Sequence, residues 1–527
     1  MTERTRDWLA AIAIALIVLP IYVLRLDRVV GMIVDDAWYV MLGRALAEGR
    51  GYWLVNAPFD HILPGYPPGF PALLSLVFRL RPDFPGNVWL LKSVSIAGML
   101  GVAMLSYFYL HRSRKLPRHL AVMSAIGIAT TPALVFLATS TAMSECVFML
   151  AQLGVVAIVH RAIDSSPERG WRLAVLAGLL GVWTVMVRSV GVAVIAAACC
   201  AFVQQRQWKR LSAFVVVVAL GFGPWLLYAR AHAPTAEHRE FHRGSIVYGY
   251  GEQFWMRFAG SASSGRVTVS DLPERIGTNV TDIGGRSFVG IFAPIVLRSA
   301  DESGEEVVFL AGQLGWTFIG FGGLPATMAI SFVLGAVVLA GFVRAVRERL
   351  TVAEFLFPIS LAITILWPFW SFRFVLPLTP FVYFYFVRGL MIAPRAPVAR
   401  LVLMTVIGLN AFDHAGYLMR MRQSPQGTDW IATYNQMETA LEWMKTHLDG
   451  DGVVAATNPA LVHLRTGLKT ITLDRVTEPW SVWRSRQARY AACLVVHDLP
   501  SASRGPYKLL YQSHPGSQAS YWVVDLY

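Results

Sequence analysis

Residues 34–39 read VDDAWY, and they follow the apolar run WLAAIAIALIVLPIYVL at positions 8–24. The run is long enough to form most of a membrane-spanning helix, so Asp35 and Asp36 stand where the chain leaves the membrane. Neighbouring carboxylates repel each other, and both resist leaving water. A protein whose main task was to sit in lipid would have little use for them there. They are therefore the first candidates for chemistry.

The composition predicts a polytopic membrane protein. Of 527 residues, 55% are hydrophobic and 15% charged, and the mean hydropathy is +0.49, which is atypical of a soluble globular protein. The first apolar run follows Arg4 and Arg6 and lacks a small-residue cleavage site. We therefore expect a retained first span rather than a signal peptide.

Hydropathy predicts about eleven spans, several of them short for a full crossing, 190–204 above all. They lie near residues 8–26, 89–110, 119–138, 143–160, 172–187, 190–204, 211–230, 326–343, 352–369, 373–390 and 398–413.

The net charge of +13 indicates how the chain crosses the membrane rather than a nucleic-acid partner. With alternating spans the basic connectors all fall on one side, which the positive-inside rule makes cytoplasmic. The N-terminus is then cytoplasmic and the C-terminus outside. No continuous basic face with interleaved aromatic residues is expected, which disfavours nucleic-acid binding. The basic connectors contain Arg112/Arg114/Lys115/Arg118, Arg161/Arg169/Arg172, Arg206/Lys209/Arg210, Arg344/Arg347/Arg349 and Arg388/Arg395/Arg400.

The four cysteines show neither metal-ligand spacing nor a disulfide framework, and we expect them to be packing residues. They are Cys146, Cys199, Cys200 and Cys493.

Three long segments are predicted on the outer face. The first, 27–88, contains a short interfacial helix from Ala37 to Glu48, with apolar residues at helical spacing. The second, 231–325, mixes Gly, Ser and charged residues. The third, 414–527, is predicted to be a small soluble α/β domain after a membrane domain of residues 1–413. Its helix carries Met437, Leu441, Met444 and Leu448, and its strands lie near 453–457, 469–473, 493–496 and 521–526.

The acidic pair has two interpretations. Paired carboxylates can act as a general base or hold a divalent cation, but Asp near a helix N-terminus is also a favourable cap. Asp36 could cap the helix while Asp35 faces a cavity. The run Tyr66-Pro67-Pro68-Gly69-Phe70-Pro71 favours function, because prolines fix an extended return toward the membrane near the acidic pair.

These motifs, in this order, resemble the polytopic C-type glycosyltransferases that use lipid-phosphate sugars, such as the protein mannosyltransferase and aminoarabinose transferase families. The matching elements are Asp35-Asp36-Ala37-Trp38-Tyr39, Glu48-Gly49, Tyr66-Pro67-Pro68-Gly69, Glu145 in Ala142-Met143-Ser144-Glu145, and Arg373-Phe374-Val375-Leu376-Pro377. The resemblance covers residues 8–390. Tyr66 stands where aminoarabinose transferases have Lys, which does not support lipid A as the acceptor, and Asp36 stands where Glu is common.

The resemblance implies roles for individual residues. Asp35 would be the base that takes the proton of an acceptor hydroxyl, while Glu145 would position the acceptor or, with Asp35, hold a cation. Arg188 and Arg373 would bind the donor phosphate, because a guanidinium matches phosphate geometry. The alternative for Arg188 is an interfacial residue that extends its charge to water.

Five further residues are candidates for binding. Tyr39, His61 and Tyr66 are candidate substrate-binding residues by their location beside the acidic pair and the proline run. His238 and His242 are spaced for a metal-ligand pair on a helix, although ordinary exposed histidines are commoner.

The leading hypothesis is an integral-membrane glycosyltransferase of a bacterial inner membrane. It would move a sugar from a polyprenyl-phosphate donor to a polysaccharide, glycolipid or protein acceptor on the outer face, with inversion at the anomeric carbon and no certain cofactor. A transporter or flippase for an amphiphile is the alternative. Transporters place ionisable residues deep in broken helices, whereas here they gather at the outer ends of spans. The third hypothesis is a non-catalytic relative, a membrane scaffold that keeps the fold of these enzymes but has lost their activity.

Overall fold

The computed structural model describes residues 2–58, 61–242, 244–261, 264–293, 323–369, 371–392, 396–423, 429–473, 480–484, 486–496, 507–513 and 519–526. The chain forms two compact units. Unit 1 comprises Met1–Asp27, Lys92–Leu226 and Asp271–Pro425, and unit 2 comprises Arg28–Leu91, Leu227–Ser270 and Gln426–Tyr527.

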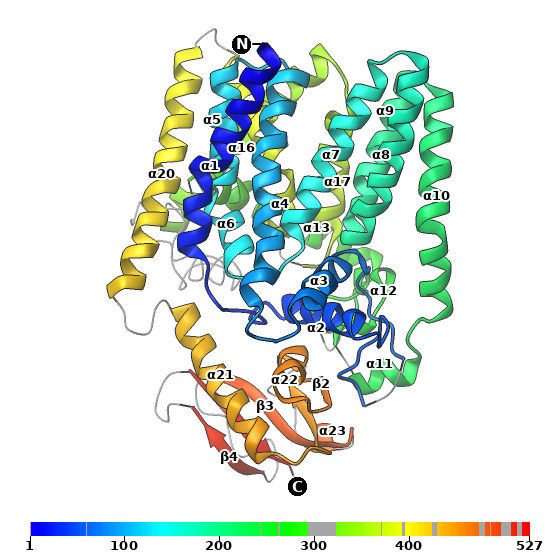
Figure 1. The fold of residues 1–527 in the computed structure, drawn as a ribbon, viewed down its shortest axis with the longest axis vertical. Coiled ribbons are helices and arrows are strands. Elements are labelled where there is room, and N and C mark those ends of the chain that lie inside the picture. Colours follow the sequence, from blue (N-terminus) through cyan, green and yellow to red (C-terminus); the bar gives the residue numbers. More distant parts are fainter. Residues whose placement is uncertain are drawn as a thin grey trace. The chain divides into compact units, whose positions relative to one another are not determined.

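Unit 1 is helical (Figure 1). Its described elements are α1 (Glu3–Arg25), α4 (Val88–Phe108), η1 (Tyr109–Ser113), α5 (Arg118–Ala129), α6 (Pro132–Thr139), α7 (Glu145–Ile163), α8 (Pro167–Val187), η2 (Ser189–Gly191), α9 (Val192–Gln204), α10 (Trp208–Ala231), α13 (Leu272–Asp282), η6 (Ile283–Ser287), α14 (Phe288–Phe292), α16 (Gly323–Glu348), α17 (Val352–Leu366), α18 (Phe372–Val375), η9 (Leu376–Leu378), α19 (Thr379–Leu390) and α20 (Ala396–Gln423). The first residues of α4 and the last of α10 belong to unit 2.

Within the described ranges, seven helices are long and apolar enough to cross a membrane: α1, α4 with η1, α7, α8, α10, α16 and α20. The pair α5 and α6 would add an eighth, although it bends by 51° where Pro132 starts a new helix. The described residues thus support seven or eight full spans among the about eleven spans predicted, several of which were expected to be short for a full crossing. Two predicted spans form helices of 13 and 15 residues, α9 and α17. The predicted span 373–390 is divided among α18, η9 and α19 at Pro377.

The helices of unit 1 pack as neighbouring pairs, α7 against α8, α16 against α19 and α9 against α17. A buried polar network joins α1, α5 and α20. Arg25 Nη1 lies 2.8 Å from His414 Nδ1, and His414 Nε2 lies 2.9 Å from the carbonyl oxygen of Thr130. The Arg25 guanidinium also stacks 3.8 Å over the ring of Tyr417. A buried cation needs such partners, so the network fixes how these helices pack.

Unit 2 combines short helices with a sheet. Its described helical elements are α2 (Asp35–Ala47), α3 (Gly69–Leu80), α11 (Ala236–His242), η3 (Ser245–Val247), α12 (Tyr250–Phe254), α21 (Asp429–His447), α22 (Pro459–Thr466) and α23 (Trp480–Arg484). The short helix η5 (Val269–Asp271) lies at the end of the middle segment of unit 2. The strands are β1 (Val453–Ala456), β2 (Thr470–Thr472), β3 (Ala488–Val496), β4 (Lys508–Gln512) and β5 (Ala519–Asp525).

The strands form one mixed sheet in the order β2-β1-β3-β5-β4. β1 runs parallel to β2 and β3, while β5 is antiparallel to β3 and β4. Its core contains Ile471, Trp483, Cys493 and Val524. The predicted small α/β fold near the C-terminus is confirmed, but β4 was not expected from the sequence.

The three chain segments of unit 2 are joined by hydrogen bonds. Thr470 on β2 donates its N–H to the carbonyl of Asn56 at 2.8 Å, and Asn56 Nδ2 donates to Thr470 Oγ1 at 2.9 Å. Both side chains are fully buried. Arg486 Nη2, in the last segment, lies 3.1 Å from Glu240 Oε1, in the middle segment. The first segment is therefore held by the strand that follows α22.

All four cysteines are free, and Cys146 and Cys493 are buried as packing residues.

Candidate functional site

The backbone turns sharply directly before the acidic pair. Val34 has φ of +60°, a conformation that is an outlier for a β-branched residue. Asp36 holds this turn, because its carboxylate accepts the Gly31 N–H at 2.9 Å and the Ala37 N–H at 3.0 Å. Strained backbone of this kind gathers at functional segments, where surrounding contacts keep it in place.

Gly31 is required for this turn. It has φ of +91°, and a Cβ at this position would come within 2.7 Å of Leu461 on α22. Any other residue would strain the backbone and clash with that helix. The turn that carries the acidic pair is therefore fitted closely against the segment around α22, within unit 2.

The two carboxylates differ in environment. Asp36 is 1% exposed and is bonded to backbone N–H groups, whereas Asp35 is only half-buried. The Tyr66 hydroxyl donates to Asp35 Oδ1 at 2.7 Å. Burial, together with the Asp35 charge, keeps the pKa of Tyr66 well above its ordinary value. Tyr66 thus remains a hydrogen-bond donor that orients Asp35.

Tyr52 holds the proline run and was missed by the sequence analysis. Its hydroxyl lies 3.0 Å from the carbonyl oxygen of Tyr66 and 3.1 Å from that of Pro67, so it donates to the loop that carries Tyr66. The residue is mostly buried, and burial raises the pKa of Tyr52 well above its ordinary value. No local motif marks it, because a tyrosine in an outer segment is unremarkable until the fold brings it to the loop.

Tyr39 and His61, the other predicted substrate-binding residues, contact different residues. The Tyr39 ring packs 5.2 Å from the ring of Tyr66 and 5.3 Å from that of Phe70. The exposed His61 packs on Trp53 at 5.3 Å between ring centroids. Among the described residues no hydrogen bond joins His61 to the acidic pair. The structure brings Tyr39 and Tyr66 together and leaves His61 outside that group.

Unit 1 contains a second cluster, centred on Glu145. Glu145 is the first residue of α7 and is 1% exposed. Arg188 Nη1, at the C-terminal end of α8, and Arg373 Nε, on α18, each lie 2.9 Å from Glu145 Oε1. Arg188 Nη1 also donates to Ser144 Oγ at 3.1 Å. All three predicted residues therefore meet at one buried carboxylate oxygen.

Two guanidinium groups meet one buried carboxylate in this cluster, at the N-terminus of a helix that itself favours an anion. Both guanidinium groups also lie within 6 Å of aromatic rings, those of Phe369 and Phe374 for Arg373 and that of Phe374 for Arg188. Two guanidinium groups held side by side in this way match the geometry of a phosphate group.

Lys92, on α4, is a buried charge that the sequence analysis passed over. Its Nζ lies 2.6 Å from Asp27 Oδ1 and 2.9 Å from the carbonyl oxygens of Asp27 and Thr139. The lysine is fully buried. The available signal was a lysine within a predicted span, which is costly and usually retained for a reason. Here it fixes the end of α1 to α4 and α6.

The described residues contain no group of three or more His, Cys, Asp or Glu side chains that could hold a metal ion. The two suggested ligands, Asp35 and Glu145, belong to different units. His238 and His242 do share the helix α11, but His242 is buried, with Nδ1 3.3 Å from Thr472 Oγ1. Its ring also lies 6.0 Å from that of Trp38. His242 therefore acts as a packing contact in unit 2.

Similar folds occur among solved membrane enzymes. The oligosaccharyltransferase of Archaeoglobus fulgidus in its apo form matches with a TM-score of 0.55 at 14% identity, over 93% of this chain and 70% of the archaeal chain. AglB from the same organism, in complex with an inhibitory peptide and a dolichol-phosphate, matches with a TM-score of 0.54 at 14% identity and the same coverage. ArnT from Cupriavidus metallidurans bound to undecaprenyl phosphate gives 0.46 at 13% identity, over 97% of each chain.

No protein-family model and no curated protein matches the chain. The likeness therefore lies in the arrangement of the backbone, at an identity too low to transfer a substrate. It extends over nearly the whole chain and includes both the membrane helices and the segments between them. The chain has the fold of the polytopic C-type glycosyltransferases, the resemblance that its sequence motifs predict.

Proposed function

We propose that this protein is an integral-membrane glycosyltransferase that uses a polyprenyl-phosphate sugar as donor. The observation that carries the proposal is the inequality of the acidic pair. Asp36 is buried and bonded to the backbone, while the half-buried Asp35 is oriented by Tyr66. A carboxylate that is oriented and partly accessible can accept a proton from a substrate, whereas one that holds a turn cannot readily do so.

The chemistry assigns one proton and one bond to this side chain. Asp35 takes the proton of an acceptor hydroxyl, and the hydroxyl oxygen forms a bond to the anomeric carbon. The bond from that carbon to the phosphate oxygen breaks, and polyprenyl phosphate leaves with the electron pair. Attack opposite the leaving phosphate inverts the anomeric configuration. A general base of this kind contributes on the order of 100-fold to 10,000-fold in rate.

In this proposal the phosphate of the donor is bound by unit 1. Arg188 and Arg373 supply two guanidinium groups, and Glu145 holds both in place at 2.9 Å. In the proposal these guanidinium groups stabilise the phosphate as it leaves. AglB, which is similar in fold, was determined in complex with a dolichol-phosphate, and this supports a lipid phosphate as part of the donor.

The membrane side is also part of the proposal. The positive-inside distribution supports a reaction on the outer face of a bacterial inner membrane. Nucleotide sugars do not reach that face, so a donor carried by a lipid fits the chemistry. The acceptor would be a polysaccharide, a glycolipid or a protein of the cell envelope.

The test is a release assay. Purified protein with radiolabelled polyprenyl-phosphate sugars should release polyprenyl phosphate, and Asp35→Asn should lower turnover at least ~100-fold. Asp451→Asn, an exposed carboxylate of unit 2, is the matched control and should turn over normally. Folding of both variants is checked by thermal denaturation.

Two results would contradict the assignment. Normal turnover by Asp35→Asn would show that another group is the base. Consumption of no donor, together with protein-dependent movement of the labelled lipid across liposomes, would establish the transporter alternative instead.

A further inference from the structure

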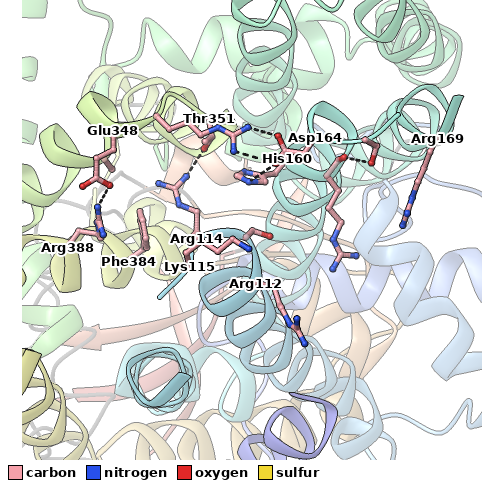
Figure 2. Close-up of a pocket in the computed structure, with 15 residues that line it drawn as sticks. Arg112, Arg114, Lys115, His160, Asp164, Arg169, Glu348, Thr351, Phe384 and Arg388 are labelled. Atoms are coloured by element: carbon pink, nitrogen blue, oxygen red, sulfur yellow. Dashed lines mark hydrogen bonds and ion pairs between the residues drawn. The ribbon is translucent and has the colours of Figure 1, made fainter. Parts of the chain in front are cut away.

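A pocket in unit 1 lies where several membrane helices end (Figure 2). Its volume is about 520 Å³. The ends of η1, α7 and α16 and the connectors that follow them line it, together with Arg169 on α8 and with Phe384 and Arg388 on α19. The lining residues are Arg112, Ser113, Arg114, Lys115, His160, Arg161, Asp164, Ser165, Arg169, Ala345, Glu348, Arg349, Thr351, Phe384 and Arg388.

The pocket carries a large surplus of positive charge. Seven of its lining residues are Lys or Arg, and two are Asp or Glu. Four of the seven cations are already paired: Arg349 with Asp164, Arg388 with Glu348, Arg112 with Asp7 and Arg114 with Glu354. Within the part of the chain that the structure describes, the side chains of Lys115, Arg161 and Arg169 make no hydrogen bond or ion pair. These three cations are therefore available to a ligand.

One cation of the pocket is built in rather than free to move. Arg114 has a side chain only 7% exposed, and its Nη1 donates to Thr351 Oγ1 at 2.7 Å. Its Nη2 lies 2.6 Å from Glu354 Oε1, and the guanidinium stacks 4.1 Å over the ring of Phe384. Figure 2 shows Arg114 next to Thr351, with the Glu348–Arg388 pair at one side of the pocket. The wall is thus preorganised, which lowers the entropy lost when an anion binds.

The location of the pocket indicates where its ligand comes from. The candidate spans Val88–Ser113, Glu145–Ile163 and Ala326–Glu348 all end in this region, and Pro167–Val187 begins there. The ends of apolar spanning helices lie at the boundary between hydrocarbon and water. Basic pockets between membrane helices at this depth are suited to the phosphate headgroups of anionic lipids.

We propose that this pocket binds a phosphate group, carried either by an anionic membrane lipid or by a small soluble molecule. The site is separate from the Glu145 cluster and uses none of its residues. A guanidinium or ammonium group near a membrane surface contributes roughly fivefold in affinity for such a headgroup. These basic residues surround a cavity in which the Arg114 side chain is fixed by its contacts.

The test compares two triple variants of the full-length protein in detergent micelles. Lys115→Gln/Arg161→Gln/Arg169→Gln removes the three free pocket cations. Arg172→Gln/Lys209→Gln/Arg347→Gln removes three exposed cations from the same set of basic connectors, outside the pocket. Fluorescently labelled phosphatidylglycerol is titrated against each protein, with labelled phosphatidylcholine and unlabelled inorganic phosphate in parallel arms. Thermal denaturation without lipid checks that both variants fold.

The proposal expects wild type and the control to bind phosphatidylglycerol alike, and the pocket variant to bind it at least ~10-fold more weakly. Little binding of phosphatidylcholine would identify an anionic lipid as the source. Displacement of the lipid by millimolar inorganic phosphate, lost in the pocket variant, would identify a soluble phosphate. Equal losses in both triple variants, or none in either, would overturn the site and leave these charges as determinants of topology only.

Discussion

At the residue scale, the neighbouring aspartates Asp35 and Asp36 have different environments. Asp36 stabilises a turn in which Val34 has φ of +60°, whereas Asp35 is half-buried and accepts a hydrogen bond from Tyr66. The carboxylate chemistry could be predicted from VDDAWY, and so could the possibility of a cap. That Tyr66 donates to Asp35 could not, because it depends on how the proline loop returns.

Tyr66→Phe tests whether Tyr66 is a positioning residue. The change removes the hydrogen bond to Asp35 and keeps the ring that packs on Tyr39. We expect kcat to fall about tenfold, since a hydrogen bond to a charged group is worth roughly 1.5–3 kcal/mol and Asp35 is partly exposed. The KM for the donor should not change. Steady-state kinetics of polyprenyl phosphate release measure both.

The pH profile distinguishes a Tyr66 that donates a hydrogen bond from a Tyr66 that transfers a proton itself. Burial and the Asp35 charge hold the pKa of Tyr66 well above its ordinary value, so its hydroxyl stays protonated up to at least about pH 10. Wild type and Tyr66→Phe should therefore share the same alkaline limb. Tyr52→Phe, which removes donation to loop carbonyls instead, should raise KM with less effect on kcat. If Tyr66→Phe keeps the wild-type kcat, the positioning role is wrong.

At the scale of elements, helices could be predicted from local sequence patterns, whereas the packing of distant elements could not. The helix from Ala37 to Glu48 appears as α2, and the helix with Met437 and Leu441 appears as α21, because helical spacing is a local property. Apolar length alone could not show that Pro132 would bend α5 against α6, or that α9 would be short. The meeting of Arg188 and Arg373 at one oxygen of Glu145 was also beyond local patterns, since it depends on the packing of three separate elements.

The contact between α11 and β2 should make unit 2 sensitive to acid. Burial lowers the pKa of His242 to about 4, whereas a histidine in the unfolded chain titrates near about 6.5. As the pH falls from about 6.5 to about 4, the unfolded state binds a proton at His242 that the folded state does not bind. The contribution of His242 to the free energy of unfolding is therefore complete above this pH range, and up to about 3 kcal/mol of it is lost as the pH falls through the range.

His242→Gln should flatten this loss, and the midpoint of thermal denaturation between pH 7 and pH 4 measures it. His238→Gln, on the same helix α11, is the control and should keep the wild-type decline. Some decline should remain in His242→Gln, because burial also lowers the pKa of His463 to about 4. Identical declines in the two variants would rule out His242 as the acid-sensitive contact.

At the scale of the whole molecule, the chain alternates between its two units. The segments 27–88 and 414–527, and the first part of 231–325, are those predicted to lie outside the membrane, and nearly the same residues make up unit 2. The membrane side itself rests on the distribution of basic connectors, a whole-chain pattern that depends on hydropathy and charge and not on how the helices pack. How the chain divides into two units depends on contacts between distant segments, which no single stretch of sequence contains.

Cysteine labelling tests the topology. In a chain whose four native cysteines are replaced by alanine, single cysteines are introduced at Arg169 and at Asp451, both exposed. A membrane-impermeant maleimide should label Asp451→Cys in intact cells and Arg169→Cys only after the membrane is opened. The reverse pattern would invert the topology, and labelling of both in intact cells would place the two positions on the same side.

The paired hydrogen bonds between Asn56 and Thr470 bear on how the protein is made. The strand that completes the packing of the acidic segment lies 414 residues further along the chain than Asn56, so it is synthesised much later. Until then the proposed base is attached to an unfinished unit. A chain truncated before Thr470 can thus insert its first helices, but we expect it to lack the packing that the proposed base requires.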